Sequence, residues 1–314
     1  MLFRSRLADS PGPAPAHCLS VDVEDYRQIL SSRYRGEPGA LSAGFERDME
    51  RVLEVLALAG TKATFFVTGT VAGARPDLLR RWAALGHEIA CHGHDHAPVW
   101  SMTAAEFRGE LSRTRRAVEE AAGRPALGYR APVFSIRWDT LWALDVVAEC
   151  GFAYDSSIVP VRTRRYGVAG FPPEPALYGL PSGLEIVEVP LTAARFWGLG
   201  VPVAGGGYFR LFSERRILRA AADCERRGRP FVLYCHPYEF GPEPVDWTDL
   251  AGAGRERLMA RLACALTNLG RTKVPRTVAR LAREFRFGPL GELARKVRDH
   301  GTKRLLAQAR PAVR

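Results

Sequence analysis

The chain has 314 residues, 46% of them hydrophobic, so it is long enough for one large domain with a substantial core. Its 45 basic and 34 acidic residues give a net charge of +11, which suits an anionic polymer or a membrane surface, and no nucleic-acid partner is expected. Six cysteines are spread singly without a CxxC motif, which argues against a disulfide framework or a structural zinc site. With no signal peptide and no membrane-spanning run visible, we expect a cytoplasmic protein.

The predicted elements alternate between short apolar strands and amphipathic helices. Residues 1–16 are expected to be a loose leader, 161–183 an irregular excursion and 286–314 a basic helical tail. Thr103 and Glu106 form a predicted capping box. Repeated strand–helix units predict an α/β fold with a parallel sheet, open or closed into a barrel. The strands are predicted at 17–23, 63–67, 87–91, 127–132, 154–158, 185–191 and 230–237, and the helices at 45–58, 77–85, 103–122, 138–150, 213–227, 255–269, 274–285 and 290–309.

Polar side chains follow several of the predicted strands. Asp22, His92, Arg130 and His236 each fall at the carboxyl end of a strand. In parallel barrels functional groups collect at this end. We therefore expect these four residues to lie in one site.

Histidines are concentrated in residues 87–96, which contain four of the seven in the chain. His92 and His96 are four residues apart, a spacing that on a helical turn directs both imidazoles to one side and favours a metal site. The third ligand is expected from the acidic cluster at residues 22–25. A solvated polar loop is the alternative interpretation of the same histidines.

Four motifs in order resemble those of the NodB-type polysaccharide deacetylases, over residues 17–285. They are Asp22-Val23-Glu24-Asp25-Tyr26 after a strand, His92-Gly93-His94-Asp95-His96 in place of His-Ser/Thr-x-x-His, Arg130-Ala131-Pro132, and Leu233-Tyr234-Cys235-His236-Pro237. The Asp-Val-Glu-Asp-Tyr variant, the Gly-Gly-Gly-Tyr-Phe-Arg run at 205–210 and a helical C-terminal extension are similar to a subgroup associated with exopolysaccharide synthesis and exosortase gene clusters. The resemblance implies a distorted (β/α) barrel with about seven strands, and removal of N-acetyl groups from an amino-sugar polymer.

The family motif usually has adjacent aspartates, the first a base and the second a metal ligand. Here Asp22 is separated from the next acid, so Glu24 or Asp25 is the expected ligand beside the two histidines. In an extended strand Asp22 and Glu24 share a face, which favours Glu24 while leaving Asp25 open. One divalent ion is expected; zinc suits the ligand set best, and cobalt, nickel or iron would be accommodated.

The expected catalytic groups are one base, one acid and one orienting cation. Asp22 would take a proton from water, Arg130 would orient Asp22, and His236 would protonate the departing amine. The alternative interpretations are an N-terminal helix cap or a plain strand-end acid for Asp22, an exposed arginine before a proline turn for Arg130, and a satisfied core histidine for His236.

Substrate-binding candidates come from four segments of the chain. A backbone N–H near residues 24–26 is expected to complete an oxyanion hole, and Leu233 to line a pocket for the acetyl methyl group. The glycines at 205–207 predict a close-approach substrate loop, and aromatic residues beside them predict stacking on sugar rings. The candidates are Tyr26, Pro132, Tyr208 and Leu233, with Trp197 and Phe209 as further aromatic residues.

The expected substrate is an N-acetylated glycan or its lipid-linked precursor in exopolysaccharide biosynthesis. The basic tail would dock the protein peripherally at the inner membrane. Two alternatives are a small-molecule amide or ureide hydrolase on the same barrel, and a catalytically silent glycan-binding protein.

Overall fold

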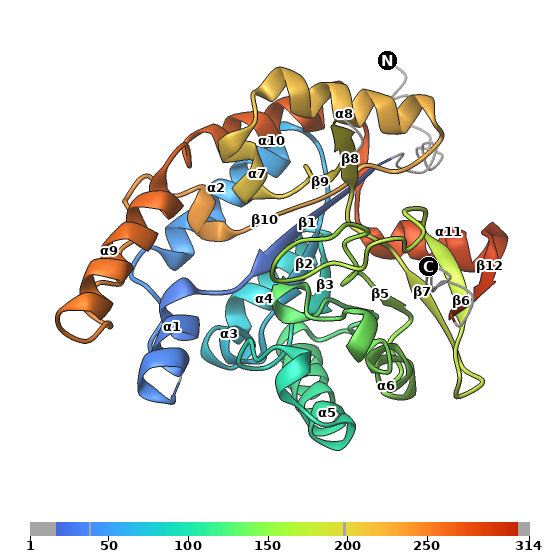
Figure 1. Ribbon diagram of the computed structural model, residues 1–314, viewed down its shortest axis with the longest axis horizontal. Helices are drawn as coiled ribbons and strands as arrows, with labels where there is room; N and C mark the ends of the chain where they lie inside the picture. Colours follow the sequence, from blue (N-terminus) through green and yellow to red (C-terminus); the bar gives the residue numbers. More distant parts are fainter. Residues whose placement is uncertain (1–16, 38, 197–198, 307–314) are drawn as a thin grey trace, which may run out of the picture.

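The computed structural model describes residues 17–37, 39–196 and 199–306 (Figure 1). The predicted leader and Trp197 lie outside the described residues. Its strands are β1 (His17–Val23), β2 (Thr64–Val67), β3 (Glu88–Cys91), β4 (Gly128–Tyr129), β5 (Tyr154–Asp155), β6 (Ala176–Gly179), β7 (Glu185–Glu188), β8 (Ala193–Phe196), β9 (Leu199–Pro202), β10 (Val232–Cys235), β11 (Phe287–Gly288) and β12 (Lys303–Leu305).

The α-helices are α1 (Tyr26–Arg35), α2 (Phe45–Leu58), α3 (Gly69–Ala74), α4 (Pro76–Ala84), α5 (Ala104–Ala122), α6 (Ala143–Glu149), α7 (Gly206–Leu211), α8 (Glu214–Arg226), α9 (Arg255–Asn268), α10 (Lys273–Glu284) and α11 (Leu290–His300). Four short 3-10 helices, η1 (Val99–Ser101), η2 (Pro132–Phe134), η3 (Trp138–Thr140) and η4 (Pro237–Glu239), connect them. The predicted capping box at the start of α5 is confirmed: Thr103 and Glu106 hydrogen-bond each other's backbone N–H groups.

One large sheet organises the chain. Its strand order is β10-β1-β2-β3-β4-β5-β7-β6-β12, with β11 also pairing with β1. From β10 to β7 every neighbouring pair is parallel, and β6 is antiparallel to β7. Within the described residues the two edge strands β10 and β12 do not pair, so the sheet is curved and open rather than a closed barrel.

Both faces of this sheet are buried, which explains why the strands are continuous apolar runs. On one face Leu19, Phe65 and Leu233 join the core formed with the surrounding helices. On the other face Cys18 and Phe66 belong to a second core that also includes side chains of α11. Successive strand residues thus point into different cores, as the pleat requires.

The C-terminal region differs from the predicted tail. Strand β11 pairs with β1, and β12 extends the sheet beside β6. At the start of α11, Leu290 N donates to Thr64 Oγ1 and Gly291 N donates to Glu88 Oε2. Thr64 and Glu88 begin β2 and β3, so α11 covers the amino end of the sheet, opposite the strand ends that carry the predicted site. Residues 287–305 are therefore part of the fold rather than a free helical tail, and the predicted helix ends at His300.

Candidate active site

The predicted polar residues converge at the carboxyl ends of adjacent parallel strands. Glu24 follows β1, His92 follows β3, Arg130 follows β4 and His236 follows β10. The order β10-β1-β2-β3-β4 brings these strand ends to one edge. Asp22, the last residue but one of β1, lies at the same edge and is buried.

Glu24, His92 and His96 form a compact cluster. Glu24 Oε2 lies 3.3 Å from His92 Nε2 and 2.5 Å from His96 Nε2, and the three ligand atoms are all within 4.8 Å of one another. Because His92 Nδ1 lies 2.9 Å from the Arg130 carbonyl oxygen, which can only accept, Nδ1 carries the proton and Nε2 of the neutral ring carries a lone pair.

This cluster suits a divalent cation. Glu24 Oε2 is fully buried and no described residue donates a conventional hydrogen bond to it. Burial opposes ionisation of Glu24, but the neighbouring rings of His96, His92 and His236 hold the pKa of its carboxyl well below the usual range. Facing lone pairs of one carboxylate and two imidazoles require a proton or a metal ion between them, and this donor set is one that zinc prefers.

The loop that carries the histidines is not the helical turn that their spacing suggested. Residues 92–98 are irregular, and the chain reverses at Gly93, with φ of 73°, and at His96, with φ of 65°. A Cβ on Gly93 would lie 2.8 Å from Pro132 Cγ and 3.1 Å from Glu110 Oε1, which explains glycine where the family has a hydroxyl residue. Instead, the buried Glu110 carboxylate accepts a hydrogen bond from His94 N and supports the loop.

Of the two acids that the sequence left open, only Glu24 reaches the imidazoles. Asp25 is the N-cap of α1: its Oδ1 accepts from Arg27 N and Gln28 N, and its Oδ2 accepts from Ser42 N and Oγ. Both oxygens are committed to backbone and hydroxyl donors, so the prediction of Asp25 as a metal ligand is wrong.

Asp22 is held by a buried arginine. Arg130 Nη1 donates to Asp22 Oδ1 at 2.6 Å and to Ser20 Oγ at 2.8 Å, while Nε donates to the Ser156 carbonyl oxygen at 3.0 Å. The guanidinium is completely buried and lies over the Phe66 ring, 4.1 Å from its centroid. These contacts fix the orientation of the Asp22 carboxylate and compensate its charge.

A second acidic pair lies near this arginine. Asp155 and Glu188 are both fully buried and hydrogen-bonded to each other. Burial, followed by the charge of Asp155, raises the pKa of Glu188 well above its usual range, and burial raises the pKa of Asp155 as well. Arg130 therefore serves two buried acidic groups. This pair was not predicted from the sequence.

His236 is held by Glu239, which the sequence analysis also missed. Glu239 Oε2 lies 3.2 Å from His236 Nδ1 and accepts from His236 N at 2.9 Å, and the imidazole stacks on Tyr238. Burial lowers the pKa of His236, but the hydrogen bond and charge of Glu239, followed by the charge of Glu24, outweigh it and raise that pKa to about 9. His236 Nε2 faces the cluster, 3.7 Å from Glu24 Oε1. The sequence did contain a signal for this contact: a glutamate three residues after the strand-end histidine, with a proline between them, is the spacing of a capping box.

The structure places two predicted substrate residues in other roles. Leu233 points into the helix-side core and is fully buried, because it has the opposite strand parity to His236; its predicted methyl pocket is therefore wrong. Tyr208 donates or accepts a hydrogen bond with Tyr166 at 2.6 Å between the hydroxyl oxygens. Phe209 lies in the core.

The predicted glycine loop is largely the helix α7. A Cβ on Gly205 would lie 2.4 Å from the Tyr234 ring, and one on Gly206 would lie 1.7 Å from Glu239 Oε2. These glycines allow close packing around Glu239, so the interpretation as a substrate loop is wrong. Among the other candidates, Tyr26 is partly exposed beside the site, and Pro132 is buried against Gly93.

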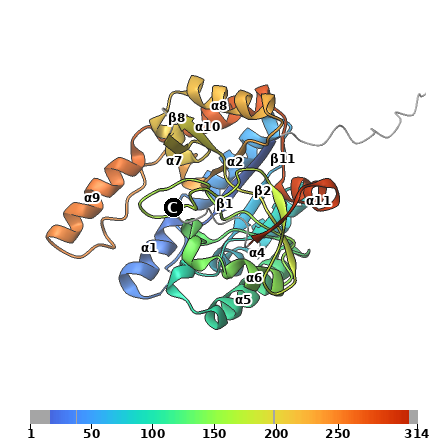
Figure 2. The same ribbon diagram turned by 45° about the vertical axis from the view of Figure 1, so that its right-hand side comes forward.

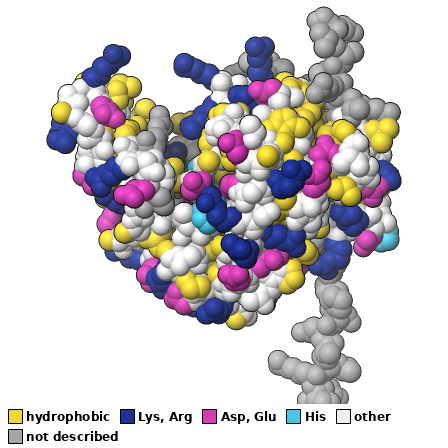
Figure 3. All heavy atoms as spheres, turned by 90° about the horizontal axis from the view of Figure 1, so that it is seen from below, with side chains coloured by type: hydrophobic (Ala, Val, Ile, Leu, Met, Phe, Trp, Pro, Cys, Tyr) yellow, Lys and Arg dark blue, Asp and Glu magenta, His cyan; other side chains and the backbone are white. Residues whose placement is uncertain are grey.

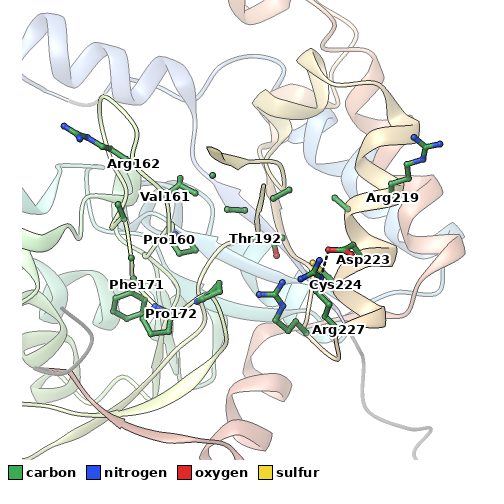
Figure 4. A pocket seen from close by; sticks show the side chains of 18 of the residues that line it. Pro160, Val161, Arg162, Phe171, Pro172, Thr192, Arg219, Asp223, Cys224 and Arg227 are labelled. Atoms are coloured by element: carbon green, nitrogen blue, oxygen red, sulfur yellow. Dashed lines mark ion pairs between the residues drawn. The ribbon is translucent and has the colours of Figure 1, made fainter. Parts of the chain in front are cut away.

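A large cavity lies apart from this chemistry (Figure 4). It has a volume of about 1140 Å³ and is lined by residues 160–162, 169–173, 192–194 and 200, by α8 and by residues just after it. Thr192, in its wall, pairs through its backbone N–H with the carbonyl of Val232, the first residue of β10. His236 follows the other end of that strand. Figure 4 shows Arg227 and Asp223 on the α8 side of this cavity.

The fold and site define an α/β protein with a candidate metal centre at the carboxyl ends of a parallel sheet. Residues 42–154 match the family described as polysaccharide deacetylase, and residues 156–295 match a domain of unknown function, DUF3473. Residues 42–154 thus match the polysaccharide deacetylase family, and the resemblance to the NodB-type deacetylases predicted from the four motifs is confirmed. The second match crosses residue 286, where the sequence had suggested a boundary.

Similar proteins of known sequence include two deacetylases. A chitooligosaccharide deacetylase of Bradyrhizobium sp. (strain ANU 289) is 34% identical over 97 residues, covering 31% of this chain and 42% of that protein. A peptidoglycan-N-acetylglucosamine deacetylase of Bacillus cereus is 28% identical over 149 residues, covering 43% of this chain and 54% of that protein. The matches thus span about half or less of these relatives' lengths.

Two solved structures share the fold. A candidate polysaccharide deacetylase from Mycobacterium smegmatis aligns with a TM-score of 0.60 and 20% identity, over 98% of this chain and 99% of that one. The allantoinase PuuE aligns with a TM-score of 0.54 and 17% identity, over 94% and 99%. The predicted NodB-type α/β fold is confirmed, in the form of an open sheet.

Proposed function

We propose that this protein is a metal-dependent hydrolase that removes N-acetyl groups from an amino-sugar polysaccharide or its lipid-linked precursor. The observation that carries the proposal is the convergence of three groups: the Glu24–His92–His96 cluster, an Arg130-held aspartate and a Glu239-held histidine. Hydrolysis of an amide needs a base for water, a positive centre for the carbonyl oxygen and an acid for the amine. The names of the related deacetylases support N-acetylated sugars as the substrate class.

Glu24, His92 and His96 would hold one divalent ion, for which zinc fits best and cobalt, nickel or iron would also fit. When bound, such an ion supplies Lewis-acid polarisation and lowers the pKa of water. Three protein ligands leave coordination positions open, as catalytic sites require. Arg130 is not a ligand itself, but its carbonyl oxygen accepts a hydrogen bond from His92 Nδ1 and so fixes the tautomer of that ligand.

Asp22 is the proposed base. Because Arg130 Nη1 occupies Asp22 Oδ1, the proton of the attacking water would be received at Oδ2. Asp22 then holds the proton while the oxygen of water bonds to the acetyl carbon.

His236 is the proposed acid. Glu239 holds Nδ1, so Nε2 is the atom that gives its proton to the sugar nitrogen as the carbon–nitrogen bond breaks. With a pKa near 9, the imidazole carries that proton at neutral pH. The products are acetic acid, which ionises to acetate, and a free amino sugar. Transfer of the proton from Asp22 to His236 then returns both residues to their starting states.

A role in exopolysaccharide biosynthesis, on the cytoplasmic face of the membrane, remains part of the proposal. It is supported by the subgroup-like motifs and the net charge of +11. None of the described helices is long and apolar enough to cross a bilayer.

Acetate release from an N-acetylglucosamine oligomer, with and without a chelator, tests the function. We expect release by the metal-loaded protein, loss after chelation and recovery on adding zinc. Turnover of a ureide without acetate release from any glycan would favour a small-molecule hydrolase, and binding of glycans without turnover would favour a silent binding protein.

A further inference from the structure

The outer face of α9 exposes a row of large apolar side chains. Leu258, Met259, Leu262, Leu266 and the following Leu269 are 66%, 57%, 54%, 60% and 63% exposed. Positions 258, 262, 266 and 269 recur every three or four residues, so they form one stripe along the helix. The opposite face is buried through the small side chains of Ala260 and Cys264.

This arrangement reverses the usual pattern of a surface helix, which buries its large apolar side chains. The other exposed leucines of the described chain, such as Leu58, Leu184 and Leu211, are distributed over separate elements. α9 lies at the edge of the molecule and projects from its body in Figures 1 and 2. A contiguous exposed apolar stripe on a projecting helix indicates a docking surface.

Basic side chains accompany the stripe. Arg255, Arg257 and Arg261 are exposed on the same helix, and none forms an ion pair with a carboxylate of the described residues. Glu256 is the single acid of α9, and its carboxylate accepts a hydrogen bond from Gly252 N. In Figure 3, the projecting lobe at the left shows apolar and basic side chains together, with acidic ones among them. The surface therefore combines apolar contact with positive charge.

The helix is connected to the mouth of the candidate site. Ala260 and Cys264 share a small core with Tyr26 and Tyr238. Tyr26 is two residues after Glu24, and Tyr238 is two residues after His236. A surface bound to α9 would therefore lie beside the carboxyl ends of the strands, where Asp22 and the cluster are located.

We propose that the outer face of α9 docks on an anionic phospholipid bilayer. The leucines would enter the boundary between headgroups and acyl chains, with the helix parallel to the surface, and the arginines would contact the phosphates. A second copy of the chain on this face would bring two sets of unpaired arginines together, whereas anionic headgroups neutralise them. The docking assignment does not depend on the proposed deacetylase activity.

Sedimentation with lipid vesicles tests this proposal without measuring catalysis. Wild-type protein should bind vesicles of phosphatidylglycerol and phosphatidylcholine more tightly than vesicles of phosphatidylcholine alone, and added salt should weaken the binding. The triple variant Leu258→Ser, Leu262→Ser, Leu266→Ser should reduce partitioning at least tenfold. The control Leu58→Ser, Leu184→Ser, Leu211→Ser makes the same chemical change at exposed leucines elsewhere and should leave binding unchanged.

Three results would overturn the proposal. They are equal binding by the α9 variant and wild type, equal binding to neutral and anionic vesicles, and a lipid-free dimer that the α9 substitutions dissociate, which would assign the stripe to a second copy. Circular dichroism and thermal unfolding of both variants should match wild type, because all six leucines are exposed. An arginine variant, Arg255→Gln, Arg257→Gln, Arg261→Gln, should reduce the preference for anionic vesicles without touching the apolar stripe.

Discussion

Replacement of Arg130 by methionine removes a buried cation that serves two acidic groups. The guanidinium donates to Asp22 Oδ1, Ser20 Oγ and the Ser156 carbonyl oxygen, and its charge faces the Asp155–Glu188 pair. Breaking a buried ion pair by removing one partner costs about 3–5 kcal/mol, since the remaining charge has no compensation. We expect Arg130→Met to lower the free energy of unfolding by that amount.

Urea unfolding followed by tryptophan fluorescence measures the change, and a double-mutant cycle assigns its cause. Asp22→Asn alone should bind metal normally and reduce turnover by about 10² or more. Asp22→Asn added to Arg130→Met should restore about 1–2 kcal/mol of the free energy of unfolding, because it removes the unpaired charge of Asp22 while the Asp155–Glu188 pair still lacks the guanidinium. A cost below about 1 kcal/mol for Arg130→Met, or no recovery in the double variant, would refute compensation of buried charge by this arginine.

The remaining predictions concern the ligand set, the acid and the loop. Glu24→Gln should abolish retention of zinc measured by mass spectrometry, whereas Asp25→Asn should retain it and lower stability by about 1 kcal/mol through the weakened cap; equal metal loss in both would contradict the ligand assignment. Glu239→Gln should lower the pKa of His236 from about 9, so the basic limb of the pH–rate profile should move to lower pH; an unmoved limb would reject His236 as the acid. Burial raises the pKa of Glu110 to about 7, from a value near 4.5 in the unfolded chain. The protonated carboxyl group therefore stabilises the fold fully below pH 4.5, and this contribution is lost as pH rises through 7. In urea unfolding, the free energy of unfolding of Glu110→Gln should rise by up to about 3 kcal/mol relative to wild type between pH 5 and pH 8, and a constant difference would contradict this.

The clustering of the site residues could be predicted from their places at strand ends, because adjacent parallel strands bring their carboxyl ends to one edge of the sheet. Glu24 was favoured over Asp25 by the parity of an extended strand, and in the structure Glu24 lies beside the two imidazoles while Asp25 caps α1. The role of Asp25 was readable in principle, since aspartate before a helix is a common N-cap. The helix it begins, α1, was not predicted.

Side-chain partners remote in sequence could not be predicted in the same way. Glu188 meets Asp155 only because β7 lies beside β5, a pairing that skips β6. The glycines at 205 and 206 face Tyr234 and Glu239, and that proximity depends on tertiary packing. The role of Leu233 was predicted from the family motif alone. Leu233 and His236 are three positions apart, so in an extended strand their side chains point to opposite faces, and this parity was not applied.

The most direct test of the account is a titration of the metal-free protein with zinc, with acetate release from an N-acetylglucosamine oligomer measured at each step. We predict binding of one ion per chain, activity that rises in proportion and saturates at one equivalent, and neither binding nor activity in His92→Ala. Undiminished acetate release from protein free of any divalent metal would contradict the assignment of Glu24, His92 and His96 as a catalytic metal centre.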